Sequence, residues 1–208
     1  MMTGAEPTLS ETSPGHRGAV WKFARAISWI GHPLVFASAS LTLVVIFRLA
    51  NRVGLSVLSV LIVAVVLPTA WLLARGVRLG QWSDADVSIR TERTRFYPRA
   101  ILLWIGGIVA LLLLRAPSFI VQGAMVTVAL LVIAALINRF LKISLHALFA
   151  FYCTVILLRI NLFSGLIALA LAILVVWSRL YLRRHALPDI LAGTALGVIG
   201  ALATIYWP

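Results

Sequence analysis

The sequence predicts an all-α protein, a polytopic transmembrane helical bundle of six to seven spans. Of its 208 residues, 62% are hydrophobic and 12% are charged, about half the charged fraction of an ordinary soluble domain. The apolar residues form long runs, and a helix needs about 20 such residues to cross a bilayer. No run shows the two-residue alternation of a barrel strand. Helices are therefore expected, since a spanning helix satisfies its own backbone hydrogen bonds.

Seven apolar runs can be placed in order along the chain. Their expected bounds are 30–50, 54–74, 100–114, 118–137, the two halves of 144–177 divided at Arg159 and Asn161, and 190–207. The run 144–177 is divided because it is too long for one crossing. The count falls to six if the first run lies partly in the membrane interface.

The segment 1–20 differs from the rest of the chain. It is rich in Gly, Pro, Ser, Thr and Glu and has no apolar block, so we expect a disordered tail rather than a secretory signal. Residues 21–208 are expected to form a single transmembrane domain. The one cysteine, Cys153, lies within an apolar run and is expected to be buried and inert.

The net charge of +12 does not indicate nucleic-acid binding, because the basic residues are strung between apolar runs. If the tail shares a face with the connections after the even-numbered spans, that face carries fourteen Lys and Arg and the other face four. The fourteen are Arg17, Lys22, Arg25, Arg75, Arg78, Arg90, Arg93, Arg95, Arg99, Arg139, Lys142, Arg179, Arg183 and Arg184, and the four are Arg48, Arg52, Arg115 and Arg159. The positive-inside rule then predicts that the basic face lies in the cytoplasm. We expect the membrane to be the plasma membrane. Without Arg90, Arg93, Lys142 and Arg179, which we assign to phosphate binding, the tally is still ten against four.

The few acidic residues point to the same face. Outside the tail they are Asp84, Asp86, Glu92 and Asp189. His146 and His185 are also expected there. Ionisable groups beside membrane spans are costly, so a functional site is the first hypothesis for such a cluster.

The polar stretch before the last run carries the clearest chemistry. His185 and Asp189 are four residues apart, so a helix would place them on one face. A carboxylate beside an imidazole fixes its tautomer and leaves the other ring nitrogen free as a nucleophile or base. Arg179 offers a planar fork of donors that suits phosphate oxygens.

The string Ser178-Arg179-x5-His185-x3-Asp189 resembles the third signature of the type 2 phosphatidic acid phosphatase superfamily, with every fixed position filled. Lys142-Ile143-Ser144-Leu145-His146 resembles the second signature, Pro-Ser-Gly-His. It keeps the serine and the histidine and has Ile143 and Leu145 in place of proline and glycine. Arg90-x6-Tyr97-Pro98 is the nearest match to the first, Lys-x6-Arg-Pro. It has tyrosine in place of the family's arginine, and Arg93 or Arg95 is a candidate substitute, with Asp86 able to hold one of these arginines.

The resemblance implies a two-step phosphoryl transfer to water. His185 would be the nucleophile, Asp189 would orient it, and His146 would be the general acid and base. Six residues would bind the phosphoryl oxygens, namely Arg90, Arg93, Lys142, Ser144, Ser178 and Arg179. No metal or other cofactor is expected, and the chain also lacks the carboxylate cluster of a two-metal phosphatase. The expected partners are the lipid bilayer and a lipid phosphate or polyprenyl (di)phosphate.

Other functions remain open from the sequence. A membrane transporter or scaffold without catalysis would need charged groups at mid-span, whereas nearly all charges here lie at span ends. A polyprenyl transferase would need several aspartates around magnesium, and only Asp86 with Arg90 resembles such a motif. A vanadate-dependent peroxidase shares the family signatures, but so apolar a chain suits a membrane-borne substrate better. His32, before Pro33, is expected to be structural.

Overall fold

The computed structural model describes residues 18–49 and 51–207, and every regular element in this part is a helix. The helices are α1 (Ala19–Ile30), α2 (Pro33–Arg48), α3 (Asn51–Leu61), α4 (Leu67–Arg78), α5 (Arg90–Leu113), α6 (Ser118–Ile137), α7 (Leu145–Ile160), α8 (Leu162–Tyr181) and α9 (Leu187–Ile205). A π-helical turn, Ile62–Val66, joins α3 to α4 without a break, so the described chain holds eight separate helices. The all-α prediction is confirmed.

Five of these helices are long and apolar enough to cross a membrane: the continuous helix of α3 and α4, then α5, α6, α8 and α9. The bent pair of α1 and α2 would make a sixth span. Helix α7 has 16 residues, so it is about 24 Å long and falls short of a hydrocarbon core of about 30 Å. The described helices thus give five to six candidate spans, and a count of seven is not supported, because the fifth predicted run corresponds to the short helix α7.

The first predicted span is instead two helices. They meet at an angle of 55°, and Pro33 is the first residue of α2, where its missing N–H costs nothing. Gly31 lies against Val175 of α8, and a Cβ there would collide with that side chain. Helix α1 begins at Ala19, inside the end of the predicted tail 1–20, and residues 1–17 of that tail lie outside the described residues.

The third predicted span begins earlier than expected. Helix α5 starts at Arg90 rather than near Ala100, and Pro98 lies inside it. The polar connection between the second and third spans is therefore residues 79–89, and the basic residues 90–99 are helical. This placement puts Arg93 on a rigid element instead of a loop.

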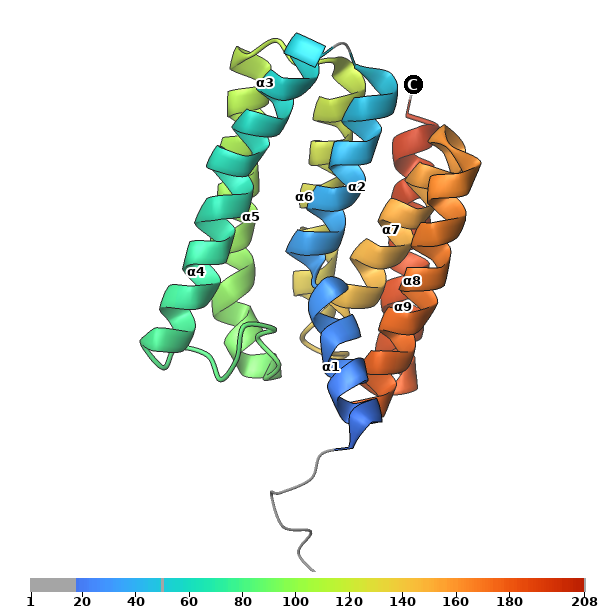
Figure 1. The fold of residues 1–208 in the computed structure, drawn as a ribbon. Coiled ribbons are helices and arrows are strands. Elements are labelled where there is room, and N and C mark those ends of the chain that lie inside the picture. Colours follow the sequence, from blue (N-terminus) through green and yellow to red (C-terminus); the bar gives the residue numbers. More distant parts are fainter. Residues whose placement is uncertain (1–17, 50, 208) are drawn as a thin grey trace, which may run out of the picture.

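The helices alternate in direction, so three connections reach the same end of the bundle, the lower end in Figure 1. They are residues 79–89, 138–144 and 182–186. Helix α9 packs closely on α7, because Gly193 and Gly197 present no side chain to it. A Cβ at Gly193 would lie 2.5 Å from the Ser144 carbonyl oxygen. These glycines bring the connection before α7 against the start of α9.

Candidate active site

The side chains of interest come from the three connections and from the helix ends beside them. His185 precedes α9, and Asp189 lies in its first turn. His146 is the second residue of α7 and follows its N-cap, Ser144. Arg179 lies in the last turn of α8, and Arg93 lies in the first turn of α5. The alternation of helix direction thus brings residues 96 positions apart in the sequence, Arg93 and Asp189, to one end of the bundle.

His185 is held through one of its two ring nitrogens. Nδ1 lies 3.1 Å from the Lys142 carbonyl oxygen and 3.4 Å from Oδ2 of Asp189. The same carboxylate oxygen accepts a hydrogen bond from the Ala186 N–H at 3.1 Å. Since both neighbours of Nδ1 are acceptors, the proton belongs on Nδ1, and Nε2 keeps its lone pair. His185 lies just before the helix, yet it still pairs with Asp189.

The surroundings of His185 favour a neutral ring. Burial, followed by the charges of Arg93, Arg179 and Lys142, lowers the pKa of His185 to about 2. Burial and the charge of Arg93 also lower the pKa of Lys142. The charges of three cationic groups therefore act on the His185 ring, and an anion placed beside them would relieve their repulsion.

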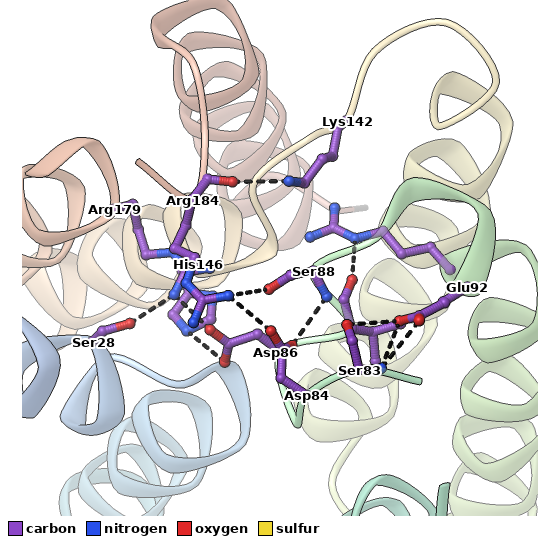
Figure 2. Close-up of polar contacts among 12 residues, drawn as sticks. Ser28, Ser83, Asp84, Asp86, Ser88, Glu92, Lys142, His146, Arg179 and Arg184 are labelled. Carbon is purple, nitrogen blue, oxygen red and sulfur yellow. Dashed lines mark hydrogen bonds and ion pairs between the residues drawn. The ribbon is translucent and has the colours of Figure 1, made fainter. Parts of the chain in front are cut away.

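Arg179 and His146 face a single carboxylate, Asp86, as Figure 2 shows. The Arg179 guanidinium donates through Nη1 to Oδ2 of Asp86 and to the Ser28 hydroxyl, both at 2.7 Å. Oδ1 of Asp86 lies 3.7 Å from Nε2 of His146. Arg179 and His146 are 1% and 4% exposed, so the half-buried Asp86 carboxylate faces two groups that are shielded from solvent.

Arg93 joins two of the three connections. Its Nε donates to the Val87 carbonyl at 2.9 Å and its Nη1 to the Ile143 carbonyl at 2.6 Å. The side chain is buried. Tyr97, at the position where the resembling family has arginine, lies one helical turn further along α5 and is buried too. Arg93 thus brings a guanidinium to the cluster from the preceding turn.

Lys142 and Ser144 lie in the connection before α7. Lys142 Nζ donates to the Arg184 carbonyl at 2.9 Å. The Ser144 hydroxyl oxygen accepts from the Ala147 N–H at 3.4 Å as the N-cap of α7, and this leaves the hydroxyl proton available. The Ser144 N–H donates to the Asp189 carbonyl at 3.1 Å, so the two signature segments are joined directly.

Two predicted phosphate-binding residues are not brought into the cluster. Ser178 is buried, and its hydroxyl donates to the Val175 carbonyl of its own helix at 2.7 Å, so its proton is already used. Arg90 is exposed and donates to the Phe140 carbonyl at 3.3 Å. Arg95, the other candidate substitute for Tyr97, is exposed as well.

Three buried nitrogens of the cluster have no hydrogen-bond partner: Nε2 of His146, Nε2 of His185 and Nε of Arg179. Buried polar atoms are normally satisfied, and an exception calls for an explanation such as an absent ligand. An anion with several oxygens would accept from the Arg179 Nε–H, and an electrophilic centre bound beside it would suit the lone pair on Nε2 of His185. Within residues 18–49 and 51–207, no three His, Cys, Asp or Glu side chains gather as a metal site would require.

Part of this site could not be predicted from the sequence. Asp86 was expected to hold an arginine of its own segment, whereas it pairs with Arg179, 93 residues away. Ser28 of α1 was not considered. His32 caps α2 by accepting from the Leu34 N–H at 3.3 Å, the structural role expected of it. Its ring also lies edge-on to that of His146, with centroids 5.6 Å apart. Only the clustering of acidic residues on one face signalled Asp86.

Comparisons with known proteins support the family resemblance. Neither the curated proteins nor the solved structures gave a match to the chain. The model of the PAP2 superfamily matches residues 118–208, which include His146, Arg179, His185 and Asp189 but not the segment with Arg93. Residues 118–208 of this membrane chain therefore form a domain of the PAP2 superfamily.

Proposed function

We propose that the protein is a metal-independent lipid-phosphate phosphatase that works through a phosphohistidine intermediate at the membrane surface. Membership of the PAP2 superfamily implies phosphatase-type activity. The observation that carries the finer proposal is the group of unpartnered nitrogens on His146, His185 and Arg179. A phosphoryl group would supply the oxygens and the electrophilic phosphorus that these atoms lack.

His185 would be the nucleophile. Its Nε2 lone pair attacks phosphorus, a P–N bond forms, and the bond from phosphorus to the lipid oxygen breaks. Asp189 and the Lys142 carbonyl hold Nδ1–H, so positive charge that develops on the ring is stabilised where it arises. The neutral ring required for attack is the form that burial and the neighbouring cations favour.

His146 would donate a proton to the departing lipid oxygen. In the second step it would take a proton from water as that water attacks phosphorus, and the P–N bond then breaks to release phosphate and free His185. Burial and the charge of Arg179 lower the pKa of His146. The incoming phosphoryl dianion, together with Asp86, whose Oδ1 lies 3.7 Å from Nε2, would supply the negative charge that favours the protonated form in the first step. Each proton that leaves His146 thus returns to it.

Arg93, Lys142 and Arg179, with the Ser144 hydroxyl, would surround the phosphoryl oxygens. Preorganised donors at developing charge are usually the largest contribution to catalysis, and three cations supply here what a metal ion supplies elsewhere. Asp86 occupies the position beside Arg179 and His146 that an anion would take, so the substrate would displace this carboxylate or share the guanidinium with it.

The substrate would be a lipid phosphate or a polyprenyl (di)phosphate. A small cavity of about 70 Å³ lies beside His146, Asp86 and Arg93. Its remaining wall is mostly apolar, with Leu73, Phe96, Trp104 and Phe149 among its side chains. An anionic group at the loops with an apolar wall behind it suits a molecule whose tail stays in the bilayer.

The location and orientation of the protein in the membrane are inferred from its apolar helices and its basic residues. The apolar helices indicate an integral multi-pass membrane protein. The excess of basic residues around the site would put it on the cytoplasmic face of the plasma membrane. We also propose that residues 21–208 act as one domain, because Asp86 and Arg93 precede the matched region 118–208 and yet contact groups within it.

Phosphate release by the purified protein tests this function. The detergent-solubilised protein would be assayed with a chelator on phosphatidate, phosphatidylglycerophosphate, polyprenyl diphosphate and a polyprenyl-linked sugar phosphate. We expect activity that survives the chelator, is lost in His185→Ala and in Lys142→Gln, and persists in Arg139→Gln, an exposed cation of the same connection. Full activity of His185→Ala, or loss of activity with the chelator, would contradict the proposal.

A further inference from the structure

A second cavity, larger than the one beside the candidate active site, lies within the helices. Its volume is about 410 Å³, within the range of small-molecule sites. It is bounded by α2, the π-helical turn, and α5, α6, α7 and α9. Leu34, Ala37, Trp104 and Phe149 line both cavities, so the larger one begins where the smaller one ends and extends away from the catalytic loops.

The wall of this cavity suits a hydrocarbon chain. Most of its lining is apolar, and the hydroxyls at its middle are already hydrogen-bonded within the protein. Thr127 donates to the Gly123 carbonyl at 2.9 Å and Thr204 to the Gly200 carbonyl at 3.0 Å. The Tyr152 hydroxyl lies 3.1 Å from that of Thr204. A tail placed there would leave none of these three groups unsatisfied.

The far end of the cavity carries charge. Arg48, the last residue of α2, and Arg159, near the end of α7, both line it. They are 16 and 13 residues beyond His32 and His146, or roughly 20–24 Å along their helices. They therefore lie at the membrane face opposite the candidate active site.

Nothing in the described chain neutralises these two arginines. Both are exposed, and no side chain within residues 18–49 and 52–207 pairs with either guanidinium. The four carboxylates of those residues are Asp84, Asp86, Glu92 and Asp189, and all of them lie toward the catalytic end. Among the described residues no carboxylate lies on the opposite face beside these two arginines, and the phosphate of a phospholipid headgroup is an anion found at that depth.

We propose that this cavity binds an anionic phospholipid of the opposite leaflet, with its headgroup phosphate at Arg48 and Arg159 and one acyl chain along the cavity. The chain would end near Trp104 and Phe149, against the wall of the smaller cavity. This site is separate from the phosphatase site, and its occupancy does not depend on the proposed catalytic function.

Quenching of Trp104 fluorescence tests this binding. The protein would be placed in phosphatidylcholine nanodiscs that contain a minor fraction of lipid brominated on its acyl chains. The brominated lipid would be either phosphatidylglycerol or phosphatidylcholine, and the signal of Trp104 would be taken as the difference from Trp104→Phe. We expect brominated phosphatidylglycerol to quench this signal at a mole fraction on the order of 30-fold lower, since each arginine near headgroups contributes about 1 kcal/mol.

Two double variants that remove the same charge distinguish binding in the cavity from general attraction of anionic lipid to the protein surface. Arg48→Gln/Arg159→Gln should abolish the preference for phosphatidylglycerol. Arg52→Gln/Arg115→Gln should retain it, because these two arginines of the same face do not line the cavity. Equal quenching by both lipids in the wild type, or equal loss in the two double variants, would overturn the proposal.

The catalytic variant distinguishes this proposal from the phosphatase proposal. His185→Ala should keep the full preference for phosphatidylglycerol even though it releases no phosphate. If His185→Ala instead loses the preference, the headgroup lies at the catalytic loops and the opposite-leaflet site is refuted. An inactive wild type that still prefers phosphatidylglycerol would leave this lipid site established and refute only the catalytic function.

Discussion

A methyl group at Gly193 should separate the two signature segments. In Gly193→Ala the new Cβ would lie 2.5 Å from the Ser144 carbonyl oxygen, whereas ordinary contacts begin at 3.4 Å. The helices must therefore part by roughly 0.9 Å, the difference between those two distances. Misplacement of catalytic groups by about 1 Å can lower a rate about 100-fold. Overpacking of a helix contact costs about 1–3 kcal/mol, less than the about 5–15 kcal/mol that holds a typical domain folded, so we expect a roughly 100-fold loss of activity in a protein that still folds.

The assay compares phosphate release and the apparent midpoint of thermal unfolding in Gly193→Ala with those in Gly106→Ala. Gly106 lies in α5, and a methyl group added there would meet no atom of another element within 4 Å. Alanine in an open helical position stabilises by about 0.5–1 kcal/mol. We expect Gly106→Ala to be fully active. The reasoning is refuted if Gly193→Ala keeps wild-type activity, or if both variants lose activity equally.

Three further predictions concern charge. Arg93→Gln should abolish phosphate release, because Arg93 is buried among the catalytic groups. Arg90→Gln should release phosphate at a rate within a few-fold of the wild type, because Arg90 is exposed. Equal loss of activity in the two variants would contradict this. Asp86→Asn should lower the inhibition constant of inorganic phosphate about tenfold, since the carboxylate beside Arg179 no longer repels the anion. Weaker inhibition by phosphate in this variant would contradict the prediction and show that Asp86 mainly positions Arg179. The pKa of His185 is lowered from 6.5 to about 2, so between these values the unfolded chain binds one more proton. Stability should then fall as the pH drops below about 6.5. The midpoint of thermal unfolding should therefore drop less between pH 7.5 and pH 5 in His185→Gln than in the wild type.

The fold and the centre of the site were predictable because they depend on local patterns. Runs of apolar residues fix which segments are helices, and alternation of helix direction fixes which connections share a face. The spacing of His185 and Asp189 predicted their pairing, although His185 precedes α9 instead of lying on it. The upper count of seven spans was too high because the length of α7 is set by its hydrogen-bonded ends, which hydropathy does not show.

The remaining site contacts could not be read from the sequence because they join distant segments. Asp86 pairs with Arg179 only after the 79–89 connection folds over the bundle. Arg93 and Arg90 are three residues apart and equally basic, yet one is buried and the other is exposed. The direction in which α5 presents its first turn decides between them. The Ser178 proton is used by its own helix, a local bond that a signature match does not reveal.

Covalent labelling of His185 is the most direct test of the proposed phosphohistidine chemistry. The wild type would be mixed with the best substrate carrying a radioactive phosphoryl group, quenched in alkali within one turnover, and mapped by mass spectrometry. The account predicts an alkali-stable, acid-labile phosphoryl group on His185 that is absent from His185→Ala. A protein that turns over substrate with no labelled intermediate, or a label that persists in His185→Ala, would contradict it.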